Sequence, residues 1–139
     1  MKPVLLDTGV IVALLDRSER LHDRSKEAVE ASGGATLVTC EAVIAESCYL
    51  LRRIAGAPEA VLDNVQQGVF RIPFQLSESV VEVRRLMHKY RDLRADFADV
   101  CLIHLANQLH SGDILTLDRD FETYRWGGKN RFHLLVSLD

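Results

Sequence analysis

The sequence contains only three prolines and no long uncharged hydrophobic run. A membrane-spanning helix needs about 18 or more apolar residues in succession, and no segment approaches that length. The first apolar stretch, residues 4–6, ends directly at Asp7, which is not the pattern of a secretory signal. With 47% hydrophobic and 27% charged residues, the composition is that of a globular protein. We therefore expect a cytoplasmic protein without membrane association.

Cysteine is also scarce. Cys40, Cys48 and Cys101 form no C-x-x-C pair and lie within apolar segments. An odd, widely spaced set of this kind is typical of buried thiols in a reducing compartment. Neither a disulfide framework nor a zinc site is therefore expected.

Short apolar runs alternate with helical patterns along the whole chain. Strands are predicted at residues 2–6, 35–39, 113–117 and 131–136, with a brief extended piece at 70–73. Helices are predicted at residues 10–15, 18–32, 41–54, 58–69, 77–90 and 96–109. This alternation predicts a single α/β domain over residues 1–139, with a small, mainly parallel, twisted sheet flanked by helices on both faces.

Two acids directly follow predicted strands. Asp7 follows the strand at residues 2–6, and Asp118 follows the strand at 113–117. Ligands of parallel α/β sheets bind at the carboxyl ends of the strands, so both carboxylates are expected in one crevice. Each acid is also well suited to cap the helix after it. For either residue alone, both interpretations stay open.

Glu46 lies in an otherwise apolar helical segment, with Tyr49 and Leu50 on its own face. An ionised carboxylate on a buried apolar face is costly unless it meets a cation or strong donors. The partner could be an arginine such as Arg52 or Arg53, or it could be a metal ion.

Asp99 repeats this pattern in a second apolar helical segment. Asp96 precedes it by three residues and lies near the helix start, where an acid interacts favourably with the helix dipole. Asp96 is therefore better explained as a cap, and Asp99 as the ligand.

Together the four acids indicate a site for a hard divalent cation. Four ionised carboxylates cannot share one crevice without compensation, and oxygen ligands suit Mg²⁺ or Mn²⁺ rather than zinc. Such a cage is the equipment of phosphodiester hydrolysis by a metal-activated water. The net charge of −3 does not exclude RNA, because the remaining acids and bases nearly balance once the proposed ligands are set aside.

The segments around these acids resemble the PIN domain, and most closely the VapC-type toxins of bacterial toxin–antitoxin pairs. The likeness is carried, in order, by VLLDTGVIVALLD around Asp7, the Glu46 helix, FADVCLIHLA around Asp99 and ILTLDRDF around Asp118. It covers essentially the whole chain. It implies a PIN fold and a Mg²⁺- or Mn²⁺-dependent endoribonuclease in which these four acids are the catalytic, metal-binding residues.

The resemblance also implies supporting residues and partners. Thr8 and Thr116 match hydroxyl positions that orient carboxylates or waters, and Asp120 matches a less uniform acid beside the site, where Asp96 is also expected. The family implies single-stranded or looped RNA as the substrate and a homodimer. A cognate antitoxin, whose C-terminal segment threads the groove, is implied as well.

A basic segment at residues 84–94 offers a separate hypothesis. Arg84, Arg85 and Lys89 could contact RNA phosphates along a helix edge. The alternative is an ordinary solvated helix face.

Several other functions are weighed against this interpretation. A histidine-driven ribonuclease needs paired histidines, and the five histidines here are scattered. An aspartyl-phosphate phosphatase would use Asp7 as nucleophile, but Gly9 stands where a second Asp is usual. A PIN-domain nuclease of RNA processing without an antitoxin, and a non-catalytic binding module on the same fold, remain as alternatives.

Overall fold

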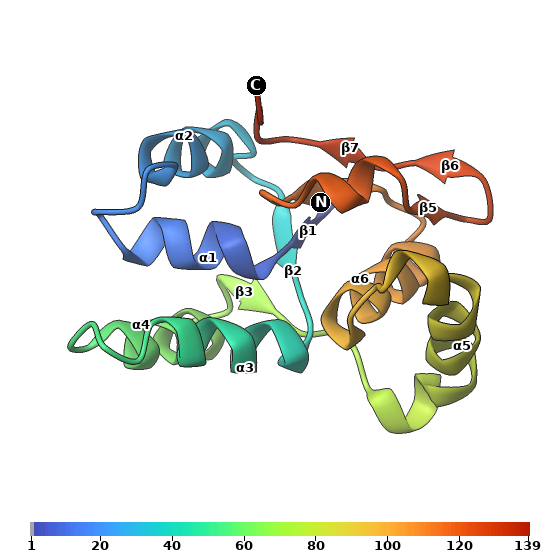
Figure 1. The fold of residues 1–139 in the computed structure, drawn as a ribbon. Helices are drawn as coiled ribbons and strands as arrows, with labels where there is room; N and C mark the ends of the chain where they lie inside the picture. The colour runs from blue at the N-terminus through green and yellow to red at the C-terminus, as the bar shows by residue number, and fades with distance from the viewer. Residues whose placement is uncertain (1) are drawn as a thin grey trace.

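A computed structural model describes residues 2–139 and contains a five-stranded sheet (Figure 1). The strand order is β3-β2-β1-β4-β7, and every neighbouring pair is parallel. The strands are β1 (Pro3–Leu6), β2 (Thr36–Val38), β3 (Phe70–Arg71), β4 (Asp113–Leu115) and β7 (His133–Leu134). The predicted parallel sheet is confirmed, with β1 at its centre.

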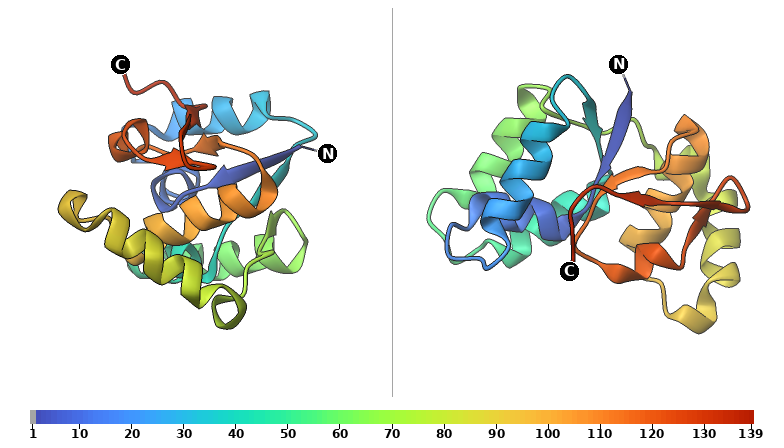
Figure 2. Two further views of the ribbon diagram at one scale, coloured as in Figure 1. Left: turned by 90° about the vertical axis from the view of Figure 1, so that its right-hand side faces the viewer. Right: turned by 90° about the horizontal axis from the view of Figure 1, so that it is seen from above.

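Helices cover both faces of this sheet, as the sequence predicts (Figure 2). One side carries α1 (Thr8–Leu15), α2 (His22–Ala31), α3 (Glu41–Leu50) and α4 (Ala57–Gln66). The other side carries α5 (Leu76–Lys89) and α6 (Phe97–Leu109). Shorter elements complete the described chain: the 3₁₀ helices η1 (Arg91–Leu93) and η2 (Arg119–Glu122), and a hairpin of β5 (Arg125–Trp126) and β6 (Asn130–Arg131).

β1 and α6 contribute many of the most deeply buried side chains of the core. Leu5 and Leu6 of β1 are almost completely buried, and so are Leu102, Ile103 and Leu105 of α6. This explains why the sequence of α6 is apolar nearly all round, since the helix lies between the sheet and α5. The first turn of α6 is thereby fixed against the end of β1.

Aromatic rings secure the segment after β4. Phe121 of η2 packs edge-to-face on Tyr124 and Phe132, with ring centroids 5.0 and 5.3 Å apart. Tyr90, at the end of α5, meets Tyr124 in the same way at 5.2 Å. Such pairs add to the hydrophobic effect of burying the rings. They hold η2, and the loop that enters it, in a fixed place.

Some predicted boundaries are wrong. The helix predicted from residue 18 begins at His22, because the Asp16 carboxylate accepts hydrogen bonds from the amide and hydroxyl of Ser18 and forms a turn. The helix predicted to residue 54 ends at Leu50. The strand predicted at 131–136 is divided into β6 and β7, and the β5–β6 hairpin was not predicted.

The amphipathic helix predicted at residues 77–90 is confirmed as α5, but its buried stripe is narrow. Val83 and Leu86 face α6 and are buried, whereas Val80 and Val81 are 50% and 76% exposed. The reason is that α5 packs mainly on one neighbouring helix, α6, so a narrow row of its side chains is covered.

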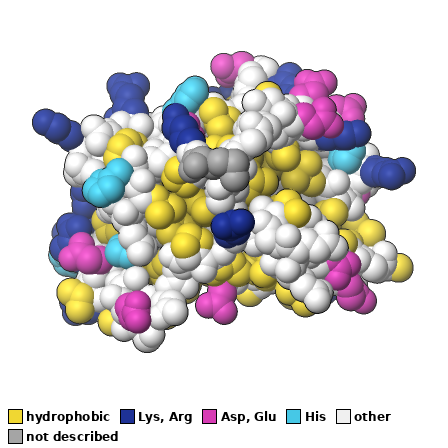
Figure 3. Space-filling model, turned by 180° about the vertical axis from the view of Figure 1, so that it is seen from behind, with side chains coloured by type: hydrophobic (Ala, Val, Ile, Leu, Met, Phe, Trp, Pro, Cys, Tyr) yellow, Lys and Arg dark blue, Asp and Glu magenta, His cyan; other side chains and the backbone are white. Residues whose placement is uncertain are grey.

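Within residues 2–139, no helix combines the length and hydropathy needed to cross a bilayer. Cys40, Cys48 and Cys101 are all free thiols. On the side of the molecule where β1 begins, hydrophobic side chains occupy much of the middle of the surface with a basic side chain among them, and most charged side chains stand around the margin (Figure 3). The acids predicted to form a site lie at the opposite, carboxyl ends of the strands.

Candidate active site

Asp7 and Asp118 leave the sheet from neighbouring strands. β1 and β4 pair in parallel, with Leu6 opposite Leu115, so the two strands end at the same edge of the sheet. The amide of Asp7 continues the ladder by donating to the Leu115 carbonyl at 3.0 Å. The expectation that these two acids share one crevice is confirmed.

Asp99 joins them from the first turn of α6. One carboxylate oxygen from each of Asp7, Asp99 and Asp118 lies within 4.8 Å of the others. Asp7 and Asp99 are only 6% and 7% exposed, and Asp118 is half-buried. Three acids distant in the sequence therefore form one compact cluster.

Thr116 ties two of these acids together. Its hydroxyl donates to Asp7 Oδ2 at 2.7 Å and accepts from the Asp118 amide at 3.0 Å. The other Asp7 oxygen accepts from the Thr8 amide at 2.8 Å. These bonds fix the orientation of the Asp7 carboxylate, in line with the supporting role expected for Thr116.

Tyr124 is a member of the site that the sequence analysis missed. Its hydroxyl donates to Asp99 Oδ2 at 2.9 Å within the buried core. No local pattern marks Tyr124, because its position depends on ring packing against Phe121 and against Tyr90, which is distant in the sequence. A tyrosine a few residues after the Asp118 segment was the only available signal.

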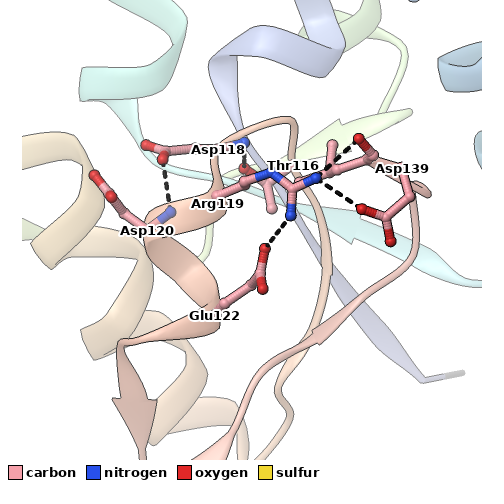
Figure 4. A network of polar contacts seen from close by, with 7 residues as sticks. Thr116, Asp118, Arg119, Asp120, Glu122 and Asp139 are labelled. Atoms are coloured by element: carbon pink, nitrogen blue, oxygen red, sulfur yellow. Dashed lines mark hydrogen bonds and ion pairs between the residues drawn. The ribbon is translucent and has the colours of Figure 1, made fainter.

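The capping and clustering interpretations prove compatible. Asp96 caps α6 by accepting from the Asp99 amide at 2.8 Å, as predicted. Asp7 caps α1, and Asp118 caps η2 by accepting from the Asp120 amide at 2.8 Å (Figure 4). Each carboxylate has two oxygens, so one acid can cap a helix and still face the cluster. The carboxylate of Asp120 itself is exposed.

The clustered acids resist ionisation. Burial, above all, raises the pKa of Asp7 to about 6, against the hydrogen bonds from Thr116 and Thr8 that lower it. Burial and the neighbouring charges of Asp96 and Asp7 raise the pKa of Asp99 to about 8. The pKa of Asp118 is also raised, mainly by burial. No ion pair within residues 2–139 compensates these three carboxylates.

The cluster lies in an open cavity of about 550 Å³. Carboxylates dominate its lining, which includes Asp7, Glu19, Glu46, Asp96, Asp99 and Asp118. Thr8 also lines the cavity, and its buried hydroxyl has no hydrogen-bond partner among residues 2–139. A buried orphan hydroxyl of this kind is costly in an empty site and is satisfied by a water or ligand oxygen.

Glu46 corrects the sequence-based picture of a buried acid. It lines the cavity from α3, but its side chain is exposed, as are Tyr49 and Leu50 at 61% and 54%. Glu46 and Leu50 border the open cavity and are exposed, so the Glu46 carboxylate meets no burial penalty. Glu46 lies outside the three-acid cluster, although its charge contributes to raising the pKa of Asp7.

The donor set fits a hard divalent cation. Three carboxylate oxygens close together, raised pKa values and the absence of a basic partner within the described chain all favour binding of positive charge. Oxygen donors without thiolate or imidazole suit Mg²⁺ or Mn²⁺ rather than zinc.

The basic residues expected to contact RNA lie elsewhere. Arg84, Arg85 and Lys89 are exposed on α5, and none of them lines the cavity. Arg85 pairs with Glu82 at 2.8 Å, and the Lys89 ammonium lies 5.2 Å from the ring centroid of Tyr90. Their contact with RNA stays a prediction.

We expect Thr116→Val to weaken the site more than the fold. The change removes a donor to Asp7 and leaves the Asp118 amide unpaired. The free energy of unfolding should fall by about 1–3 kcal/mol as a result. The pKa of Asp7 should rise further, and Mn²⁺ binding, measured by titration calorimetry, should weaken. Thr39→Val is the matched control, because the buried Thr39 hydroxyl donates to the Leu6 carbonyl at 2.7 Å and not to an acid. Equal Mn²⁺ affinity in the two variants would contradict the assignment.

The fold and the cavity together place this chain in a class of α/β proteins. In this class, acids at the carboxyl ends of parallel strands and on an adjacent helix form a site suited to a divalent cation. The sequence profile of the PIN domain matches residues 4–127. The chain therefore belongs to the PIN domain family, as its sequence motifs indicate.

Two proteins of Mycobacterium tuberculosis show where in the family the similarity lies. The chain is 31% identical to Ribonuclease VapC26 over 135 residues, covering 95% of this chain and 99% of the relative. Its fold matches the crystal structure of VapC20, described as a toxin that cleaves the sarcin–ricin loop, with a TM-score of 0.76 and 19% identity. That match covers 86% of this chain and 93% of VapC20.

Proposed function

We propose that the acidic cavity is the active site of a metal-dependent endoribonuclease of the VapC type, formed by residues 1–139 as one domain. The observation that carries this proposal is the cluster of Asp7, Asp99 and Asp118. The cluster occurs in a PIN-domain chain that is 31% identical, over nearly its full length, to a protein named as a ribonuclease. The chain is accordingly a hydrolase of RNA phosphodiesters.

The residues divide into ligands and supports. Asp7, Asp99 and Asp118 would hold Mg²⁺ or Mn²⁺, with Glu46 contributing from the cavity wall. When bound, a divalent ion lowers the pKa of a water molecule and neutralises charge on the phosphodiester. Thr116 holds the Asp7 carboxylate in one orientation through its hydrogen bond.

Two further side chains complete the arrangement. The Tyr124 hydroxyl holds one oxygen of Asp99 and leaves the other free for a ligand. Thr8 lines the cavity, and its buried hydroxyl, which has no hydrogen-bond partner among residues 2–139, would be satisfied by a water or a phosphate oxygen bound there. The chain would then need no nucleophile of its own, because the bound ion would supply an activated water for hydrolysis, in which a P–O bond forms to the water oxygen as the P–O bond to the leaving ribose oxygen breaks.

The test is cleavage of a labelled single-stranded RNA by the purified protein. We expect fragments with Mn²⁺ or Mg²⁺, none with EDTA, and restored cleavage when Mn²⁺ is added back in excess. Cleavage that persists in EDTA would favour a histidine-driven mechanism and reject the metal site. Sequencing the 5′ ends of fragments from cells expressing the protein would identify the RNA that is cut.

The proposal extends to partners. Similarity to VapC26 supports a cytoplasmic toxin that is held inactive by a cognate antitoxin. We also propose a homodimer, which the exposed Val80 and Val81 on α5 would favour as an apolar contact surface.

A further inference from the structure

Arg119 stands alone as a basic side chain among the acids of the cavity. Six carboxylates line the cavity, and Arg119 is the only cationic residue that the described chain contributes to the lining. RNA carries a negative charge on every phosphate, so these carboxylates repel it unless cations compensate. Even two divalent ions would leave the lining with a net negative formal charge. A permanently charged basic side chain in the lining therefore favours binding of the RNA substrate.

The guanidinium of Arg119 points away from the Asp118 carboxylate and toward Glu122 and Asp139 (Figure 4). Its Nη1 donates to Glu122 Oε1 at 2.9 Å. Its Nη2 donates to the Leu138 carbonyl at 3.0 Å and to Asp139 Oδ1 at 2.9 Å. Arg119 thus holds the segment Ser137–Asp139 beside η2.

These ion pairs are weak and exchange readily. The side chains of Arg119, Glu122 and Asp139 are 57%, 51% and 93% exposed, and exposed pairs are screened by water and salt. A guanidinium also matches a phosphate with two parallel hydrogen bonds. A phosphate at the cavity mouth can therefore replace Asp139 as the partner of Arg119.

We propose that Arg119 binds a phosphate of the RNA substrate at the mouth of the cavity, and that Asp139 competes with this phosphate for the guanidinium. The inference rests on the proposed ribonuclease function and adds to it a substrate-binding residue. Arg119 contacts the substrate, whereas Asp139 acts only by occupying Arg119.

Arg24 provides a matched control. From α2, its Nη1 donates to the Ser137 carbonyl at 3.1 Å and to the Asp139 carbonyl at 3.0 Å. Arg24 and Arg119 therefore hold the same segment, but Arg24 does not line the acidic cavity. If Arg119 merely anchors the segment, the two alanine variants should behave alike.

The experiment measures binding of a fluorescent single-stranded RNA of randomised sequence by anisotropy, with Ca²⁺ replacing Mn²⁺. We expect Arg119→Ala to weaken binding roughly tenfold or more, as loss of a charge-assisted contact does. Arg119→Lys should recover part of the affinity, Asp139→Asn should bind more tightly than wild type, and Arg24→Ala should match wild type. The slope of log affinity against log salt should decrease by about 0.7 in Arg119→Ala, because one phosphate contact is lost.

The outcomes separate this inference from the proposed function. Equal binding by Arg119→Ala and Arg24→Ala, or an unchanged salt slope, would overturn the role of Arg119 even if wild-type protein cleaves RNA with Mn²⁺. Selective weakening in Arg119→Ala, together with a wild-type protein that does not cleave RNA, would instead retain Arg119 as an RNA contact and reject the ribonuclease.

Discussion

Asp99→Asn is expected to reduce kcat/KM for RNA cleavage by at least about 1000-fold, because a cation site of this kind supplies several kcal/mol to the reaction. Asp99 is buried at the centre of the cluster, and an amide cannot supply its negative charge to a bound cation. The Asn side chain keeps an oxygen that can accept the hydrogen bond from the Tyr124 hydroxyl, so the fold should survive. Cleavage assays with Mn²⁺, alongside circular dichroism, provide the measurement.

Two variants bracket this result. Asp113→Asn changes an acid at the amino end of β4, where it pairs with Lys2 at 2.6 Å, and should leave cleavage intact. Glu46→Gln removes an exposed acid from the cavity wall outside the cluster, so raising the Mn²⁺ concentration should largely restore its cleavage. An Asp99→Asn protein that cleaves RNA and binds Mn²⁺ normally would remove Asp99 from the proposed site.

The metal-free protein should lose stability as pH rises from about 4 to 8. The pKa values of Asp7, about 6, and Asp99, about 8, lie above the 3.8 of an unfolded aspartate. The folded state therefore binds more protons than the unfolded state across this window, and the free energy of unfolding falls with increasing pH. Asp7 alone accounts for a loss of roughly 2–3 kcal/mol within this window.

Urea denaturation in EDTA at several pH values measures this effect. The stability difference between Asp7→Asn and wild type should grow in favour of the variant from pH 4 to pH 8, whereas Asp113→Asn should retain the wild-type decline. Saturating Mn²⁺ should abolish the decline in the wild type, because the ion binds the ionised, folded form. Parallel pH profiles for wild type and Asp7→Asn would show that Asp7 ionises without cost.

The raised pKa values of Asp7 and Asp99 distinguish two states of the cavity, one protonated without a cation and one ionised with a cation bound. Without a cation, the raised pKa values of Asp7 and Asp99 keep these acids protonated to higher pH than a free aspartate, and protonation limits repulsion in the cluster. A bound cation must displace those protons, so metal affinity should increase with pH while metal-free stability decreases. This opposition is the physical signature expected of a site that is shaped for a ligand at some expense of stability.

Local sequence signals were sufficient for the framework of the site. The apolar run that ends at Asp7 and the one that precedes Asp118 identified strand ends, because burial selects aliphatic residues directly and locally. The cap at Asp96 could be predicted for the same reason, since its hydrogen bond spans only three residues. Family motifs then supplied the order of the four acids.

Tertiary structure decided which of these side chains meet and which face solvent. Glu46 looked buried because its neighbours are apolar, yet only the packing of α3 shows that this face lines a cavity. Tyr124 reaches Asp99 because ring packing against Phe121 and Tyr90 fixes its place, and Arg119 meets Asp139 across twenty residues. Hydropathy and helix periodicity indicate whether a segment tends to be buried and which secondary structure it prefers. The partner of a polar side chain depends on long-range packing, which no local pattern encodes.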